Sequence, residues 1–214
     1  MRLGSSPEVA PTAGLAAAGW PRRRQRSGLA GGAAYQRSQQ VLTLPAAPPP
    51  VAAPLAQALL LGSSLLERRR LGGALCDALD EAYGLPSCRL VVADRPQTHA
   101  LQEGGRLASK TYGYYRCTLP AGGGAPERCT IRIYHRTAIR QQVLAAKPFC
   151  NTLLHEWMHH YDFAGLHLGR SPHTTGFFTR LRWLAEQLQV AVVLPPEESG
   201  PGARRAESWA AAAE

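Results

Sequence analysis

Lysine is almost absent from this basic chain of 214 residues. Lys110 and Lys147 are the two lysines, so arginine supplies 22 of the 24 basic side chains behind the formal net charge of +9. The arginines are spread along the chain, and alanine, glycine and proline are abundant, which is typical of a GC-rich coding sequence. Without a concentrated basic stripe, the charge allows a nucleic-acid partner but does not indicate one.

The chain also lacks closely paired cysteines. Its five cysteines include no C-x-x-C spacing, which argues against a zinc ribbon, and an odd number without a framework is typical of a reduced intracellular protein. We expect small buried thiols. Because Cys117 and Cys129 flank a glycine-rich loop, these two can be cross-strand neighbours.

No segment has the pattern of a secretion signal or a membrane span. The arginines at 22–24 and 26 are followed by small and polar residues instead of an apolar core, which excludes a secretory signal peptide. The apolar stretch from Leu55 to Leu66 is too short to cross a bilayer and runs directly into charged residues. We therefore expect a cytoplasmic protein without a membrane partner.

Composition divides the chain into three parts. Residues 1–53 are rich in proline, alanine, glycine and arginine and show no helical or strand periodicity, so we expect a disordered tail. Residues 54–192 carry the periodic apolar pattern of one folded domain. Residues 193–214 are predicted to form a loose C-terminal tail.

Within the domain, the pattern predicts helices around a small sheet. A leading helix over 54–83 has leucines at helical spacing, ends at Gly84-Leu85-Pro86 and can be broken in two at Gly72-Gly73. The pattern then predicts three strands followed by two helices, over 88–92, 108–117, 130–135, 148–163 and 174–190. This order is typical of an α+β fold, in which the three helices pack on a three-stranded or larger antiparallel or mixed sheet.

The most informative segment is the H-E-x-x-H sequence from His155 to His159. Residues four apart share one helix face, so these two histidines can offer two imidazoles to one metal ion. Glu156 can reach a water on that ion and serve as general base, as in zinc hydrolases. With seven histidines and eleven glutamates in the chain, the spacing arises by chance only about 1% of the time.

The surroundings of this sequence favour a metal-binding helix. Pro148 suits the first turn of a helix. Phe149, Leu153, Trp157 and Tyr161 recur at intervals of four and form a core-facing stripe, with the histidines on a neighbouring stripe. We therefore expect a zinc site on a helix that is anchored in the core.

Residues 55–190 resemble the SprT-like zinc metallopeptidases. The resemblance rests on the leading helix, the segment Tyr112-Gly113-Tyr114-Tyr115-Arg116, the strand Thr130–His135, the H-E-x-x-H helix and the segment Ser171-Pro172-His173-Thr174-Thr175-Gly176-Phe177-Phe178. It implies that His155, His159 and His173 bind Zn²⁺ and that Glu156 is catalytic. His173 is followed by threonine where the family has glycine. Some members of the family cleave proteins crosslinked to DNA.

Other zinc-peptidase patterns leave alternatives for the third ligand. A metzincin would need glycine at 162 and histidine at 165, where this chain has Asp162 and Gly165, so that pattern fails. A gluzincin would use a downstream helical glutamate, for which Glu186 is well placed, and His167 is a further rival. Asp162 can instead accept a hydrogen bond from a ligand imidazole.

Two functions are consistent with these observations. The first is a zinc endopeptidase that hydrolyses protein or peptide substrates with Glu156 as the general base. The second is a zinc-stabilised module that binds nucleic acid or protein without turnover. Glu156 distinguishes them, because a structural zinc site does not need this carboxylate and normally closes its fourth position.

Overall fold

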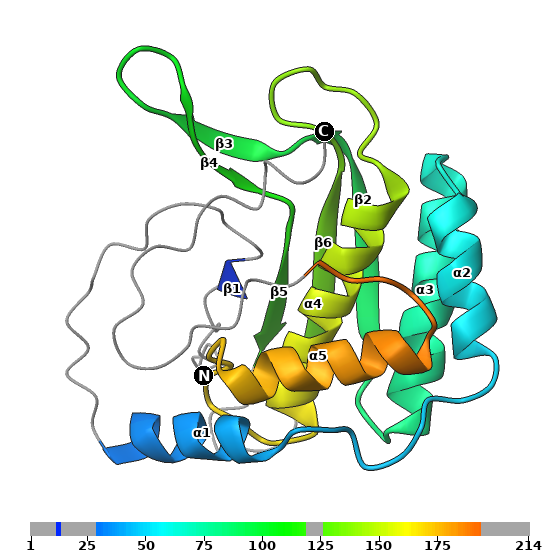
Figure 1. The fold of residues 1–214 in the computed structure, drawn as a ribbon, viewed down its shortest axis with the longest axis vertical. Coiled ribbons are helices and arrows are strands. Elements are labelled where there is room, and N and C mark those ends of the chain that lie inside the picture. Colours follow the sequence, from blue (N-terminus) through cyan, green and yellow to red (C-terminus); the bar gives the residue numbers. More distant parts are fainter. Residues whose placement is uncertain (1–11, 14–28, 119–125, 194–214) are drawn as a thin grey trace, which may run out of the picture.

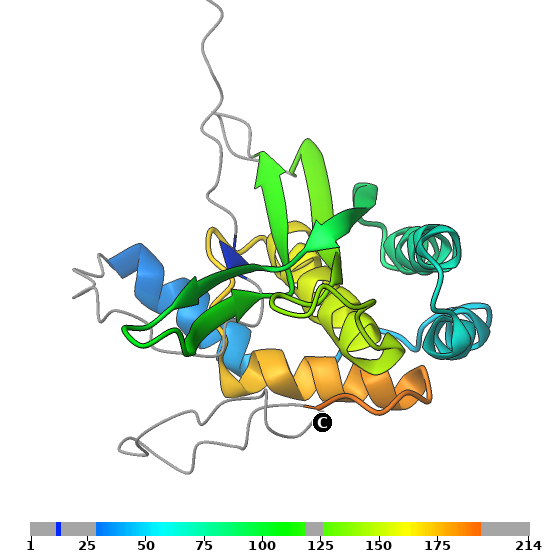
Figure 2. The same cartoon turned by 90° about the horizontal axis from the view of Figure 1, so that it is seen from above.

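A central helix, α4 (Ala146–Ala164), packs on one face of a mixed β-sheet and carries the H-E-x-x-H sequence (Figure 1, Figure 2). The computed structural model describes residues 12–13, 29–118 and 126–193. The other elements are β1 (Thr12–Ala13), α1 (Leu29–Gln40), α2 (Ala52–Leu61), α3 (Leu65–Ala82), β2 (Cys88–Pro96), β3 (Thr98–Leu101), β4 (Leu107–Thr111), β5 (Gly113–Thr118), β6 (Arg128–Arg136) and α5 (Thr175–Gln187). Helix α5 crosses α4 on the side away from the sheet. The α+β fold predicted from the sequence is confirmed.

The sheet combines parallel and antiparallel strands. Its order is β1-β5-β6-β2, in which β2 and β6 run parallel while β5 is antiparallel to both of its neighbours. Strands β3 and β4 form a separate antiparallel hairpin. The strand predicted over 108–117 is divided at Tyr112 into β4 and β5, and β3 was not predicted. The residues of β3 are all exposed, so this strand lacks the apolar alternation by which strands are recognised.

Strand β6 alternates between buried and half-buried residues from Cys129 to Ile133, whereas Tyr134 and His135 beyond it are both buried. Ile131 and Ile133 are fully buried in the core that α4 shares with the sheet. Cys117 lies directly opposite Cys129, as the sequence suggested, and Cys88 lies opposite Cys129 on the other side. A row of three buried thiols therefore crosses β5, β6 and β2 near one end of these strands, and all five cysteines are free.

The leading helix is interrupted ten residues earlier than predicted, between Leu61 and Leu65. Ser64 caps α3: its hydroxyl accepts a hydrogen bond from the backbone of Glu67, whose side chain accepts one from the backbone of Ser64. The predicted break at Gly72-Gly73 is wrong, since both glycines lie inside α3. A Cβ atom at Gly72 would lie 2.6 Å from Cδ2 of Leu90, so the small residue allows α3 to approach β2 closely.

The prediction of disorder up to residue 53 is wrong for residues 29–53. This stretch contains α1 and the start of α2, and its Ser38 and Leu44 are buried. Helix α1 contacts α5, and polar contacts described below hold it there. The rest of the predicted tails falls on residues 12–13, which pair with β5, on residue 193, or outside the described residues.

Helix α4 is buried on all sides from Phe149 to Ala164. The predicted stripe of Phe149, Leu153, Trp157 and Tyr161 does face the core, but α2, α5 and the sheet also cover the other faces. Asp80 of α3 fixes the helix further, since it accepts hydrogen bonds from Trp157 Nε1 at 2.8 Å and from the Cys88 backbone at 2.7 Å. Among the described residues, no helix combines the length and the apolar character needed to cross a membrane.

Candidate metal centre

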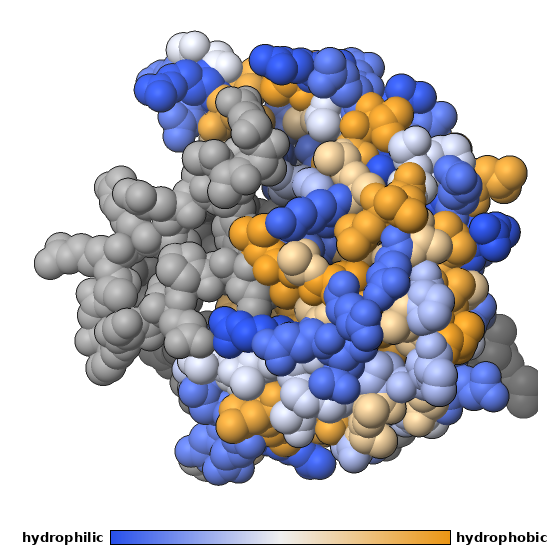
Figure 3. All heavy atoms as spheres, turned by 45° about the vertical axis from the view of Figure 1, so that its right-hand side comes forward, coloured by the Kyte–Doolittle hydropathy of each residue, from blue (hydrophilic) through white to orange (hydrophobic). Residues whose placement is uncertain are grey.

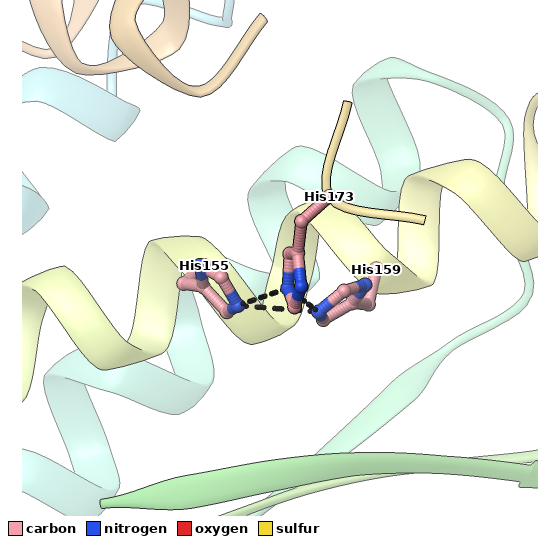
Figure 4. A group of neighbouring side chains, drawn as sticks. All are labelled: His155, His159 and His173. Atoms are coloured by element: carbon pink, nitrogen blue, oxygen red, sulfur yellow. Dashed lines mark hydrogen bonds between the residues drawn. The ribbon is translucent and has the colours of Figure 1, made fainter. Parts of the chain in front are cut away.

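Three histidine side chains converge above the middle of α4 (Figure 4). His155 and His159 come from successive turns of α4, and His173 comes from the segment that leads into α5. Their Nε2 atoms are 3.2 Å apart for His155 and His159, 3.0 Å for His155 and His173, and 3.1 Å for His159 and His173. The structure thus brings together all three histidines that the sequence predicted as ligands.

The spacing of these nitrogens fits one tetrahedral cation. Zinc holds nitrogen ligands at about 2.0–2.1 Å, which separates neighbouring ligands of a tetrahedron by roughly 3.4 Å. Three neutral imidazoles that point lone pairs at one another would repel without a shared proton or cation. The group can therefore hold a metal ion, and its donor set of three imidazoles suits zinc among other transition metals.

The site is closed on one side and open on the other. His155 and His159 are 2% and 0% exposed, whereas His173 belongs to the exposed residues. On the face of the molecule drawn in Figure 3, polar and apolar side chains are mixed, and neither kind forms one continuous surface. Burial lowers the pKa of His155 and of His159 well below the usual range, so both imidazoles are neutral at physiological pH and ready to bind a cation.

A phenylalanine holds the three rings together. The ring of Phe177 is fully buried, and its centroid lies 5.1 Å from that of His155, 4.8 Å from that of His159 and 5.1 Å from that of His173. Phe178 stacks on the ring of His173 with an interplanar angle of 17°. The aromatic pair that follows His173 in the sequence therefore supports the ligands directly.

The start of α5 fixes the position of His173. Thr174 is the N-cap of α5, and its hydroxyl accepts a hydrogen bond from the Phe177 backbone at 3.0 Å. Because the residue after His173 is fixed by this cap, the backbone next to the ligand is fixed as well.

Glu156 is the most unusual carboxyl group of the site. It is completely buried, and neither of its carboxyl oxygens has a hydrogen-bond partner among the described residues. Burial raises the pKa of Glu156 well above its usual range, and only the Tyr115 backbone opposes this shift. A buried carboxyl group that has only this weak interaction with the Tyr115 backbone is costly for the fold, and groups of this kind are more common at functional sites than elsewhere.

The rival ligands lie elsewhere. His167 is exposed, with a positive backbone φ of 53°, and Glu186 is exposed on α5; neither belongs to the histidine group. His160, which follows His159 on α4, is buried outside the group and contacts the Tyr115 hydroxyl at 3.1 Å and the Pro86 carbonyl at 2.9 Å. Asp162 does not touch a ligand imidazole directly, because Ser171 lies between it and His159.

Comparison of the chain with protein-family models, with curated proteins and with solved structures gives no match. The interpretation of the site therefore depends on its own geometry and chemistry.

Proposed function

We propose that this chain is a SprT-like zinc endopeptidase that hydrolyses peptide bonds with Glu156 as general base. The observation that carries the proposal is the meeting of three Nε2 atoms within 3.2 Å of one another, next in sequence to a buried carboxyl group without partners. Helix α4 supplies two candidate ligands and the base, and the segment before α5 supplies the third ligand, which resembles the arrangement of H-E-x-x-H zinc hydrolases.

The chemistry divides between the cation and the chain. A bound zinc ion would acidify water and polarise the substrate carbonyl. Glu156 would take a proton from the attacking water and deliver it to the nitrogen of the leaving amine. A cation held by the three histidines would favour the ionised form of Glu156 and so oppose the effect of burial on its pKa. His155, His159 and His173 would hold the ion, and the burial of Glu156 would limit the access of bulk water to its carboxylate.

The number of ligands favours catalysis over a purely structural site. Structural zinc is normally held by four protein ligands, whereas catalytic zinc keeps one position for water or substrate. Among the described residues, the group contains three histidines and no cysteine or carboxylate as a fourth member. The exposed position of His173 leaves a side from which a peptide can approach.

The test is casein cleavage by the purified, zinc-loaded protein and by its Glu156→Gln variant. The amide is nearly isosteric and cannot accept the proton, so we expect zinc to stay bound while turnover falls by about 10²–10⁴-fold. Glu186→Gln on the exposed face of α5 is the matched control and should keep full activity. Zinc binding without any cleavage by the wild type would instead support the zinc-stabilised binding module.

Substrates and partners belong to the same proposal. A protein or peptide is the substrate that this chemistry implies, and the resemblance to SprT-like peptidases suggests nucleic acid as a further partner. Casein cleavage should therefore be measured with and without single-stranded DNA. Stimulation that falls steeply with added salt would support a phosphate-binding contribution from the arginines.

A further inference from the structure

Hydrogen bonds continue from the metal-binding group into the interior of the protein. The Nδ1 atom of His159, on the side of the ring away from the other histidines, lies 2.6 Å from the Ser171 hydroxyl oxygen. That hydroxyl donates to Oδ2 of Asp162 at 2.8 Å. Ser171 thus bridges a candidate ligand and a buried carboxylate that lies three residues further along the same helix.

The directions of these hydrogen bonds are determined by the groups themselves. Ser171 has one hydroxyl proton, and it is used toward Asp162, whose carboxylate only accepts. Nδ1 of His159 must therefore donate its proton to Ser171. In this tautomer the Nε2 lone pair is free, and Nε2 is the atom that faces His155 and His173.

An arginine ties this chain of contacts to the N-terminal helix. Arg180 of α5 is fully buried and donates from Nη2 to Oδ1 of Asp162 at 2.6 Å. From Nη1 it donates to the Ser38 carbonyl at 2.8 Å and also to the Val41 carbonyl. The negative charge of Asp162 is thus neutralised by a guanidinium whose Nη1 and Nη2 groups also donate to α1 and to the residue that follows it.

We propose that Ser171 is a positioning residue that fixes the tautomer and orientation of His159 for metal binding, and that Asp162, Arg180 and α1 support it in that role. This inference rests on the metal binding assumed in the proposed function, but not on peptidase activity. Ligand imidazoles whose second nitrogen is hydrogen-bonded bind metal more tightly, and loss of such a partner commonly weakens affinity by about 10–100-fold.

The test measures zinc affinity of the full-length chain by competition with a chromophoric chelator. Ser171→Ala removes the acceptor for His159 and should weaken zinc binding by about 10–100-fold. Ser171→Thr restores a hydroxyl at the same atom and should recover affinity to within about threefold of the wild type. Thr179→Ala is the matched control, because this hydroxyl bonds only the Thr175 carbonyl within α5.

Two spectroscopic readouts separate positioning from general stability. The visible absorption of the cobalt-substituted protein reports ligand geometry, and it should change in Ser171→Ala but not in Thr179→Ala. Long-range ¹H–¹⁵N NMR of the zinc-loaded wild type should show His159 with its proton on Nδ1. Metal binding through Nδ1 of His159 would overturn the inference. Because this spectrum is measured on the wild type, it decides the question even if Ser171→Ala folds poorly.

The outcomes distinguish this inference from the proposed function. A wild-type protein that binds zinc while Ser171→Ala binds it equally well overturns the role of Ser171 alone. A wild-type protein that binds no zinc after reconstitution overturns both. Weak binding in Ser171→Ala that the threonine variant restores supports the positioning role whether or not casein is cleaved.

Discussion

Ser38 and Thr174 are 136 residues apart in the chain, yet their hydroxyl groups share a buried hydrogen bond of 2.9 Å. Ser38 belongs to α1, and Thr174 is both the N-cap of α5 and the neighbour of His173. The contact therefore joins an N-terminal helix to the segment that presents one of the three histidines.

Removal of residues 1–45 should destabilise the domain. The truncation takes away the carbonyls of Ser38 and Val41 and leaves donors of the buried Arg180 without partners. An unsatisfied buried donor costs about 1–3 kcal/mol, and 1 kcal/mol lowers the melting temperature of a domain this size by about 2–4 °C. Differential scanning calorimetry should show a loss of at least ~5 °C. Ser38→Ala, which keeps the carbonyl, should lose less, and an unchanged truncated protein would contradict the contact.

Two glycine substitutions should shift stability in opposite directions. A Cβ atom at Gly176 would lie 2.1 Å from the carbonyl oxygen of Ser38 and 2.8 Å from that of Gln39. Because backbone atoms cannot move aside cheaply, Gly176→Ala should destabilise the protein by about 1–3 kcal/mol. Nothing lies within 4 Å of a Cβ at Gly73 inside α3, so Gly73→Ala should gain up to about 1 kcal/mol. Urea unfolding of both variants checks the contrast; equal effects would argue against close packing of α1 on α5.

The composition of the metal-binding group predicts which substitutions reduce zinc affinity and peptide cleavage. Elemental analysis of the reconstituted protein should give about one zinc per chain. His173→Ala should lower zinc affinity strongly and abolish peptide cleavage, since two helical imidazoles are too few for a stable site. His167→Ala and Glu186→Ala should leave both properties unchanged, because the two residues are exposed and outside the group. If His173→Ala kept its zinc affinity and peptide cleavage while Glu186→Ala lost activity, the third ligand would be Glu186 and the chain would belong to the gluzincin class.

Zinc affinity should depend only weakly on pH above the acidic range. Each ligand that must lose a proton costs about tenfold in affinity per pH unit below its pKa, so three ordinary histidines would cost about a thousandfold per unit. Burial lowers the pKa of His155 and His159 well below 6.5. His173 reaches the surface, but the aromatic rings packed on its imidazole desolvate it and lower its pKa to about 4. We therefore expect a slope of at most about tenfold per unit between pH 7 and 5 in chelator competition. A much steeper fall below pH 6.5 would mean that the histidines titrate as exposed groups.

The parts of the fold that the sequence predicted well depend on local periodicity. The apolar stripe through Phe149 and Trp157 placed α4, and the alternation around Ile131 and Ile133 placed β6. The start of α3 does have a local signal, since Ser64 and Glu67 form the S-x-x-E pattern of a capping box. The glycine pair at 72–73 does not break the helix, because Gly72 instead serves close packing against Leu90.

The remaining features depend on contacts between distant segments. Helix α1 has few apolar residues, and buried polar contacts with Arg180, about 140 positions away, hold it in place. Ser171 gives no signal in the sequence, because a single serine in a loop becomes informative only when His159 and Asp162 are seen on either side of it. His173 followed from a resemblance to a family and not from spacing alone.

The position of His173 also has a consequence for how the domain holds together. His159 lies on α4, and His173 lies 14 positions later in the segment before α5, so a cation shared by them would act as a crosslink that closes the intervening loop. Such a ligand stabilises the native state by about 2.7 kcal/mol at a hundred times its dissociation constant. Removal of the ion by a chelator would then weaken the attachment of α5 to the core, so that this part of the domain would unfold on heating, or be cleaved by proteases, before the rest.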